Sequence, residues 1–393
     1  MRINFNKKFH KQKRDPYQLL LKTVGVLGIV VVVSLAVFFL CRGLIENEFV
    51  GKRAALDEQN MEAEQEFNAR INALRSSNSA RATQQEDGEE RELLFWERTL
   101  EDNLWRIEDE GTAMEANVSA VTVERRELIN GGLLLVNQWH ALPPDFSDEE
   151  VLGVGTTSNY KIKVQDATVR LMPNAFDALT AMIEDANEEK LTDFIVREGY
   201  RSMERQTEMF EAEVESLSRR YSGERLIEQA KRRVNYPGTS DYQTGLSFRM
   251  DLYPAPRDVK FQQSEYGRWF TENSWKYGAV FRFPTLDFPD SSWEDKSYKT
   301  GVSVTLNLYR YVGKAHAAAM RVLDYCLEEY VEFLIDHPHI CIYKDGALQY
   351  EIFRIPSEEI LEAYELPVPN PASEYQASLD NMGGIVMAYT YNQ

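Results

Sequence analysis

The polar residues best placed for chemistry lie at 237–251, which reads PGTSDYQTGLSFRMD. Two glycines and a proline predict a turn, and the residues after it alternate as in a strand with one buried face. Leu246, Phe248 and Met250 form the apolar side of this strand. The polar side carries Ser247, Arg249 and Asp251. A single carboxylate beside an arginine does not make a metal site, whereas an arginine can bind a carboxylate group.

A second group of reactive side chains lies at His337, His339 and Cys341, in the sequence HPHIC. On a strand these alternate residues would face one side, and imidazole and thiolate are metal ligands. A fourth ligand is not evident, and Pro338 favours a loop at this point. We interpret the segment as a helix-to-strand connection with incidental histidines.

The elements that must position these residues form a mixed α and β pattern after residue 130. Segment 169–189 passes from a strand into a helix, and FIVREGYRS at 194–202 is a strand that ends in a turn. A long helix is expected over 203–230, a strand over 245–252 and a helix over 316–335. The final segment, 336–393, is β-rich, and its Lys-Asp-Gly turn is typical of a hairpin.

The N-terminal region predicts a membrane anchor. Residues 23–41 form an uncharged apolar run, long enough as a helix to cross the hydrocarbon layer. No small-residue cleavage site follows the run, so the anchor is expected to be retained. Residues 1–22 carry seven lysines and arginines against one acidic residue. The positive-inside rule therefore predicts a single-pass protein with a cytoplasmic N-terminus and an extracytoplasmic bulk.

Residues 44–126 are expected to form a helical stalk. The apolar positions from Leu93 to Val121 are separated by three, four or seven residues, which is typical of an amphipathic helix. The stalk could be a coiled coil that dimerises or binds a protein partner. It could equally be a hairpin of two helices close to the membrane.

Charge and cysteine content exclude some classes of protein. The formal net charge of -19 over 393 residues gives no electrostatic footprint for nucleic acid. The three cysteines are too few for a disulfide framework. Cys41 lies at the predicted membrane boundary. Cys326 and Cys341 could form a bond, but their spacing fits two buried free thiols equally well.

The order of segments over about 130–335 resembles the VanY-type D-alanyl-D-alanine carboxypeptidases. REGYRSMERQ resembles the Gly-Tyr-Arg-Ser turn of that family, PGTSDYQTGL its Ser-x-His-x-x-Gly motif, and KTGVSVTLNLYRYVG the strand that delivers its last ligand. The resemblance implies an α+β fold with a small antiparallel sheet and flanking helices, as in the VanY and Hedgehog-like zinc peptidases.

The residues at the metal positions depart from the family pattern. The three zinc-ligand positions hold Tyr242, Arg249 and Leu308, and the position of the general base holds Thr305. A zinc peptidase needs three ligands with lone pairs and a carboxylate that takes a proton from the metal-bound water. The resemblance implies zinc, but these four residues do not support it, and we expect neither a cofactor nor metal-dependent hydrolysis at this site.

The residues that do match the family imply binding. Arg201 matches an arginine that faces the substrate, and Ser240 and Gln243 match residues that line the same cleft. With Arg249, these residues could bind the carboxylate of a peptidoglycan stem peptide. Alternatively, Arg249 pairs internally with Asp251 or Asp241. We expect an inactive member of the family at a bacterial envelope, which binds such a peptide or a protein partner. The alternatives are a zinc carboxypeptidase with unusual ligands and a membrane assembly protein that acts through 44–126.

Overall fold

The computed structural model of the protein describes residues 96–112, 114, 117–254, 259–357 and 359–391. These residues belong to one compact unit, 92–393. The predicted cytoplasmic tail at 1–22, the membrane span at 23–41 and the stalk up to residue 95 lie outside the described residues. Within the described part of the chain, no helix is both long and apolar enough to cross a membrane.

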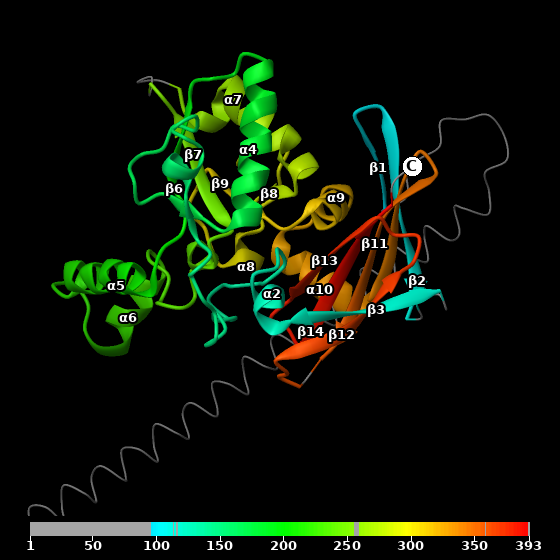
Figure 1. The fold of residues 1–393 in the computed structure, drawn as a ribbon. Coiled ribbons are helices and arrows are strands. Elements are labelled where there is room, and N and C mark those ends of the chain that lie inside the picture. Colours follow the sequence, from blue (N-terminus) through cyan, green and yellow to red (C-terminus); the bar gives the residue numbers. More distant parts are fainter. Residues whose placement is uncertain (1–95, 113, 115–116, 255–258, 358, 392–393) are drawn as a thin grey trace, which may run out of the picture. The chain divides into compact units, whose positions relative to one another are not determined.

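A four-stranded antiparallel sheet lies at the centre of the first half of this unit. Its strand order is β6 (Phe194–Glu198), β7 (Ser247–Leu252), β9 (Leu308–Tyr311) and β8 (Ala279–Phe281). Helices α4 (Pro173–Glu188) and α7 (Glu265–Asn273) pack on one face, as Figure 1 shows. Alternate strand residues such as Phe248, Met250 and Tyr309 join these helices in a buried core. The other face of the sheet carries the side chains of Glu198, Arg249 and Leu308.

The described part of the first half of the unit contains nine further elements. They are β4 (Leu152–Gly153), α3 (Val154–Thr157), β5 (Arg170–Leu171), α5 (Met203–Leu217), α6 (Gly223–Lys231), η1 (Asp241–Thr244), η2 (Phe261–Gln263), η3 (Ser274–Tyr277) and α8 (Ser297–Thr300).

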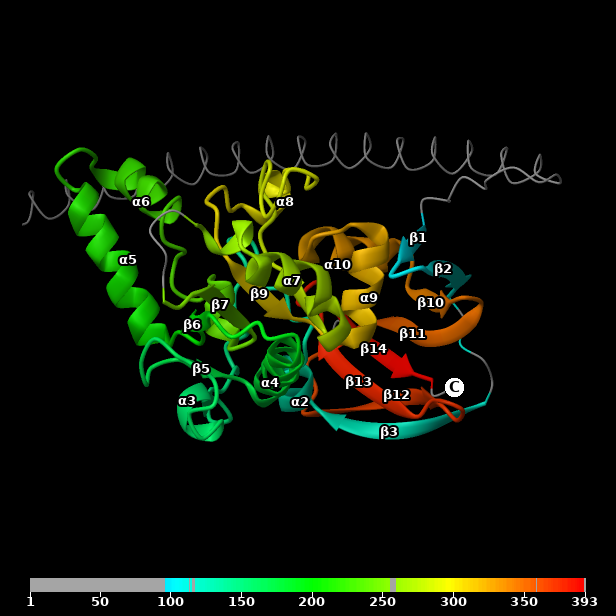
Figure 2. The ribbon, with the colours of Figure 1, turned by 90° about the horizontal axis from the view of Figure 1, so that it is seen from above.

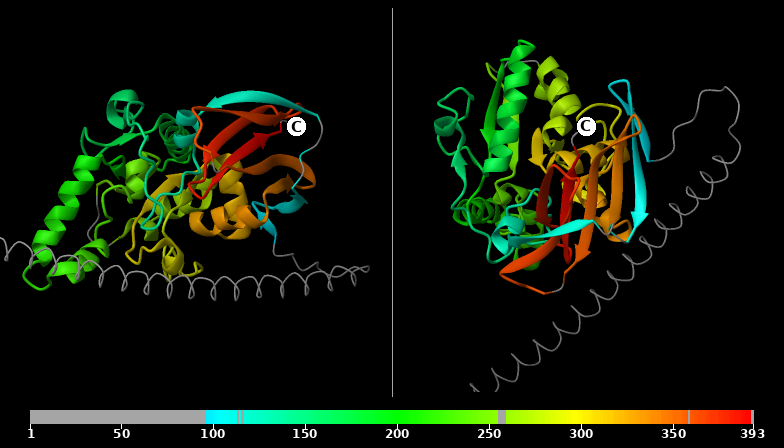
Figure 3. Two further views of the ribbon diagram at one scale, coloured as in Figure 1. Left: turned by 90° about the horizontal axis from the view of Figure 1, so that it is seen from below. Right: turned by 45° about the vertical axis from the view of Figure 1, so that its right-hand side comes forward.

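A six-stranded antiparallel sheet forms the second half of the unit. Its order is β1 (Glu97–Leu100), β2 (Asn103–Gly111), β10 (His339–Lys344), β11 (Ala347–Pro356), β14 (Gly384–Thr390) and β13 (Glu374–Leu379). Helices α9 (Lys314–Leu323) and α10 (Leu327–Asp336) pack on one face. A two-stranded ribbon covers the other face and consists of β3 (Val118–Glu124) and β12 (Ala363–Pro369) (Figures 2 and 3). The short helix α2 (Arg125–Ile129) follows β3 directly.

The helix predicted over Leu93 to Val121 is wrong for the described residues, which form β1, β2 and β3. Trp105 and Ile107 alternate with polar residues, and both enter the core beneath α9 and α10. Strand β2 pairs with β10, more than 200 residues further along the chain. This distant pairing overrides the helical spacing, so the described residues of this segment, which form β1 to β3, are not part of a helical stalk or coiled coil.

Two long predicted helices are each divided. The segment predicted at 203–230 forms α5, capped by the Ser202 hydroxyl, and then α6, whose first residue Gly223 has a φ of +59°. The segment at 316–335 falls within α9 and α10, which are separated at Asp324 with a φ of 59°. Backbone in this left-handed region ends a helix.

The predictions for the strand at 245–252 and for the C-terminal tail are confirmed. Strand β7 buries Phe248, Met250 and Leu252 and leaves Arg249 and Asp251 half-buried. The tail supplies β10 to β14, and the Lys-Asp-Gly turn joins β10 to β11 with positive φ at Asp345 and Gly346. The tail shares its sheet with β1 and β2, so it is not a separate extension.

Candidate functional site

The turn before β7 fixes the backbone of the site. Residues Asp241–Thr244 form the 3-10 helix η1, and Gly245 follows with a φ of +71°. A Cβ at Gly245 would lie 3.0 Å from the Met172 side chain, so the turn needs glycine both for its conformation and for its space. The backbone N–H of Arg201 donates to the carbonyl of Tyr242, 3.2 Å away, and so joins the Gly-Tyr-Arg-Ser turn to η1.

Three residues lie side by side on the face of the sheet opposite α4. Glu198 on β6 is in register with Arg249 on β7, and Arg249 is in register with Leu308 on β9. The first pairing depends on a bulge between Val196 and Glu198. Without the bulge, Arg197 would lie opposite Arg249 and place two like charges together.

Two of the three positions predicted for zinc ligands lie in a small apolar cluster. Tyr242 and Phe283 are 6% exposed and Leu308 is fully buried; partly buried Val302 and Leu306 pack against them. Burial raises the pKa of the Tyr242 phenol far above its usual range, so the phenol stays neutral. Thr305, predicted at the position of the general base, is exposed on the loop before β9. Tyr242, Arg249 and Leu308 offer a neutral phenol, a permanent cation and a hydrocarbon, so the donor set does not fit zinc.

Arg201 and Arg249 converge on one carboxylate. The Nε of Arg201 donates to Oε1 of Glu198 at 2.7 Å, and Nη2 of Arg249 lies 3.7 Å from Oε2 of the same residue. Arg201 also donates to the Gln206 side chain at 3.2 Å. Its guanidinium lies over the ring of Tyr242, 3.9 Å from the centroid. Two guanidinium groups share one carboxylate, which leaves a net charge of about +1 at this point.

The two arginines differ in access to solvent. The Arg249 side chain is 39% exposed and that of Arg201 is 14% exposed. The Nε of Arg249 is buried and has no hydrogen-bond partner among the described residues. Arg249 therefore keeps an unused donor, at a nitrogen that solvent does not reach.

The internal partners predicted for Arg249 are wrong. Asp251 pairs with Arg197 at 3.0 Å, and Asp241 is fully used by two other arginines. The actual partner, Glu198, was missed by the sequence reasoning. The available signal was its place directly before the Gly-Tyr-Arg-Ser turn, three residues from Arg201.

The structure places Ser240 and Gln243 in the interior, where each is 1% exposed. The side-chain oxygen of Gln243 accepts from the backbone N–H of Gly238 at 2.7 Å. Its amide nitrogen contacts the sulfur of Met203 at 3.5 Å. Gln243 thus stabilises the turn, and a direct contact of either residue with a ligand stays a prediction.

A buried ionic network lies beneath the site. Asp241 accepts from Arg310 at 2.6 Å and from Arg282 at 3.2 Å, and Arg282 also binds Glu328 with two hydrogen bonds. Burial alone would raise the pKa of Asp241, but the charges of Arg310 and Arg282 outweigh it and hold that pKa below the usual value. The backbone carbonyls of Gly132 and Leu134 accept from Arg310. The network fixes η1 against β8, β9 and α10.

Known proteins resemble this chain over the same region. The sequence profile of the VanY family, described as D-alanyl-D-alanine carboxypeptidase, matches residues 168–314. A D-alanyl-D-alanine carboxypeptidase of Enterococcus faecium is 24% identical over 283 residues, covering 72% of this chain and 82% of the relative. YodJ of Bacillus subtilis, which is named as a putative carboxypeptidase, is 33% identical over 206 residues, covering 51% of this chain and 67% of the relative.

A solved structure supports the fold. The vancomycin resistance D,D-dipeptidase VanXYg, in complex with a D-Ala-D-Ala phosphinate analogue, superposes with a TM-score of 0.54 at 22% identity. The superposition covers 70% of this chain and 99% of that structure. At this identity the likeness concerns the fold, and the chemistry of the site depends on the residues described above.

Proposed function

This chain belongs to the VanY family of D-alanyl-D-alanine carboxypeptidases, and we propose that it is a member that binds a peptide carboxylate at Arg201 and Arg249 without hydrolysing the peptide. The proposed ligand is the C-terminus of a peptidoglycan stem peptide. The proposed location is the outer side of a bacterial membrane, where the helix expected at 23–41 would anchor the chain.

The observation that carries the loss of hydrolysis is the composition of the cluster at the metal positions. Tyr242 and Leu308 pack together in the interior, and Arg249 stands between Glu198 and Leu308. Hydrolysis by this fold requires an activated water, and neither a lone-pair donor set nor a carboxylate base is present at the matched positions. A different alignment of this region cannot supply a histidine ligand, because the sequence has no histidine between His140 and His316.

The arginine pair supports the binding half of the proposal. Planar guanidinium groups bind carboxylates with two parallel hydrogen bonds. Glu198 occupies both arginines at present, but its contact with Arg249 is long, at 3.7 Å. An incoming carboxylate would therefore displace Glu198 from Arg249 more easily than from Arg201, which Glu198 binds at 2.7 Å. Because Tyr242 and Leu308 fill the interior, the ligand would contact only Arg201 and Arg249.

Peptide titration of the full-length chain tests the proposal. The probe is diacetyl-L-Lys-D-Ala-D-Ala, followed by calorimetry, with the same peptide as its C-terminal amide for comparison. We expect wild type to bind the acid and not the amide. Arg249→Gln and Arg201→Gln should each weaken binding about 10-fold or more, the loss of one charge-assisted hydrogen bond. Arg205→Gln is the matched control, because Arg205 is exposed and pairs only with Glu208 in the described structure.

Two outcomes would overturn the proposal. Release of D-alanine from the probe by wild type, dependent on added zinc, would establish the alternative of a zinc carboxypeptidase with unusual ligands. Equal binding of the acid and the amide, or no binding by any variant, would exclude carboxylate recognition at this site. A protein partner would then become the leading explanation for the retained fold.

A further inference from the structure

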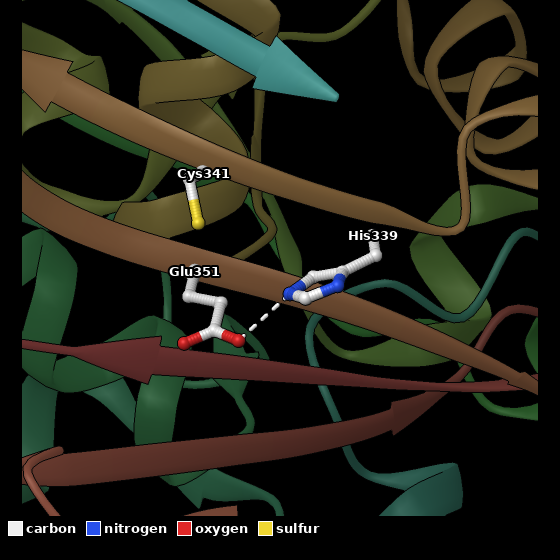
Figure 4. Close-up of side chains that lie close together, drawn as sticks. All are labelled: His339, Cys341 and Glu351. Atoms are coloured by element: carbon white, nitrogen blue, oxygen red, sulfur yellow. Dashed lines mark hydrogen bonds and ion pairs between the residues drawn. The ribbon is translucent and has the colours of Figure 1, made fainter. Parts of the chain in front are cut away.

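Three side chains with metal-binding atoms meet on the six-stranded sheet, away from the arginine site. They are His339 and Cys341 on β10 and Glu351 on β11, and one ligand atom of each lies within 4.8 Å of the other two. Figure 4 shows the imidazole, the thiol and the carboxylate turned toward one another. All three residues are buried, at 4%, 7% and 8% exposure.

The strand register explains why these three residues meet. Cys341 lies directly opposite Glu351, and His339 lies two residues before Cys341 on the same face. Side chains opposite one another in an antiparallel pair are about 5 Å apart at Cβ. On the other side of β10, Glu108 of β2 lies opposite Cys341. The thiol is thus flanked by a carboxylate from each neighbouring strand.

The helix-to-strand connection predicted for HPHIC is confirmed, and the three side chains considered there do not share one face. Strand β10 begins at His339, whereas His337 ends α10, stacks on Phe333 and pairs with Asp109 at 2.5 Å. Glu351, ten residues after Cys341 and on the other strand of the hairpin, takes the place of His337. The sequence interpretation considered His337 together with His339 and Cys341, whereas the fold brings Glu351 to the other two.

The three side chains are already held in place by neighbours. Nε2 of His339 lies 2.8 Å from Oε1 of Glu351, and the hydroxyl of Tyr391 donates to Oε2 of Glu351. The His339 ring packs edge-to-face against Phe353, with the ring centroids 5.2 Å apart. A hydrogen bond from Tyr391 to the carboxylate is the kind of outer contact that orients a metal ligand.

We propose that His339, Cys341 and Glu351 supply three of the four ligands of a zinc site that joins β10 to β11, with the fourth position left to water or to another side chain. Imidazole, thiolate and carboxylate are the three ligand types that zinc uses, and a thiolate selects zinc over magnesium and calcium. Tetrahedral coordination at the usual bond lengths brings ligand atoms to about 3.5 Å from one another. The ligand atoms lie within 4.8 Å of one another, so they need to approach by roughly 1 Å at most.

The charge around the cluster is compatible with a cation. Burial, followed by the charges of Glu351, Glu110 and Glu108, raises the pKa of the Cys341 thiol to about 12. Without metal the thiol is therefore neutral at pH 7, and binding of zinc would release its proton. Arg106 pairs with Glu108 at 2.6 Å and offsets part of the negative charge. The site is on a different sheet from Arg249, so it can exist whether or not the arginine site binds peptide.

Metal analysis of the full-length chain tests the site directly. The chain is dialysed against one equivalent of zinc chloride and then against metal-free buffer, and retained zinc is measured by mass spectrometry. We expect about one zinc per wild-type chain and loss of that zinc in Cys341→Ser and in Glu351→Gln. Tyr391→Phe, which removes only the contact to the carboxylate, should weaken zinc binding about 10- to 100-fold. Zinc should raise the melting temperature of wild type and leave that of Cys341→Ser unchanged.

Cobalt substitution reports the thiolate ligand directly through its absorption spectrum. Cobalt bound to wild type should give a thiolate-to-cobalt charge-transfer band in the near ultraviolet. The band should persist in Cys326→Ser and in Cys41→Ser, which remove the other two thiols, and disappear in Cys341→Ser. Absence of retained zinc in wild type, or full retention in a folded Cys341→Ser, would overturn the proposal. In that case the His339–Glu351 pair is a buried hydrogen bond only.

Discussion

The guanidinium of Arg201 lies 3.9 Å from the centre of the Tyr242 ring. The sequence predicts that Arg201 corresponds to the substrate-facing arginine of the family and that Tyr242 stands at a zinc-ligand position. A cation over an aromatic face is stabilised by about 0.5–2 kcal/mol, depending on its desolvation. On that prediction, the tyrosine at 242 offers no metal ligand but supports the arginine.

Glu198→Gln should strengthen binding of diacetyl-L-Lys-D-Ala-D-Ala. Glu198 occupies both Arg201 and Arg249, so it competes with an incoming carboxylate for the same donors. The neutral amide keeps the shape of the side chain but lowers the competition, and we expect binding about 5- to 10-fold tighter by calorimetry. Asp251→Asn is the control, because Asp251 pairs with Arg197 on the same sheet. Weaker binding by Glu198→Gln would show that the carboxylate positions the arginines rather than competing for them.

Leu308→Ala should destabilise the fold strongly although it removes no polar group. Leu308 is fully buried against Tyr242 and Phe283, and truncation of such a leucine costs about 2–5 kcal/mol. The measurement is the free energy of unfolding in urea. Val304→Ala on the adjoining loop is the matched control, because Val304 is 51% exposed and its loss should cost within about 0.5 kcal/mol. Equal losses would mean that Leu308 is not part of a packed cluster.

Much of the site's strand could be predicted because its pattern reports a local contact. Phe248 and Met250 alternate with Arg249 because one face of β7 packs on α4, and that alternation is visible in a few residues. The partner of Arg249 could not be predicted in the same way. The bulge on β6 shifts the register by one residue and puts Glu198 opposite Arg249 in place of Arg197. Nothing in the residues of one strand fixes the register of its neighbour.

The wrong prediction for residues 93–121 has a similar cause. Leu100, Leu104 and Ile107 fit helical spacing, but Trp105 and Ile107 also fit the alternation of a strand. The choice between them depends on β10, which supplies the hydrogen-bonding partner of β2. The metal-type cluster depends on a nearer pairing, because Glu351 reaches Cys341 across the β10–β11 hairpin. The Lys-Asp-Gly turn indicates that hairpin, but the register that puts Glu351 opposite Cys341 follows only from the folded strands.

Asp241→Asn should be among the most destabilising single changes in the described structure. Asp241 is buried, and its carboxylate accepts from Arg310 at 2.6 Å and Arg282 at 3.2 Å. Removal of one partner from a buried ionic network costs about 3–5 kcal/mol, because the remaining charge is left without compensation. Asp251→Asn, at a partly exposed pair, should cost about 0–1 kcal/mol in the same urea experiment. A small effect of Asp241→Asn would mean that water or another group compensates Arg310.

The same carboxylate predicts a loss of stability in acid. The pKa of Asp241 is held below its ordinary value of 3.8 in the folded chain. Its contribution is therefore present at pH values above 3.8 and is lost as the pH falls through the lower, folded value. Between these two values the unfolded chain binds a proton that the folded chain does not. Asp241→Asn should remove this part of the acid dependence of the free energy of unfolding.

His316 predicts a second pH dependence, in a higher range. Burial lowers the pKa of His316 from 6.5 to about 3, so the folded chain keeps the imidazole neutral, with Nδ1 2.9 Å from the Tyr330 hydroxyl. Below pH 6.5 the unfolded chain takes up a proton that the folded chain refuses. The free energy of unfolding should therefore decrease as the pH falls from 6.5 toward 3, by up to about 1.4 kcal/mol per pH unit for this one group.

Two variants isolate the effect of His316 from that of the other histidines. His316→Asn should flatten the dependence between pH 6.5 and 4, because asparagine does not titrate. Tyr330→Phe removes the hydrogen bond but leaves the imidazole buried, so it should keep the wild-type slope. Burial is the physical cause of the lowered pKa, and the hydroxyl is not required for it. A slope that is the same in wild type and His316→Asn would mean that His316 becomes protonated in the folded chain near its ordinary pKa.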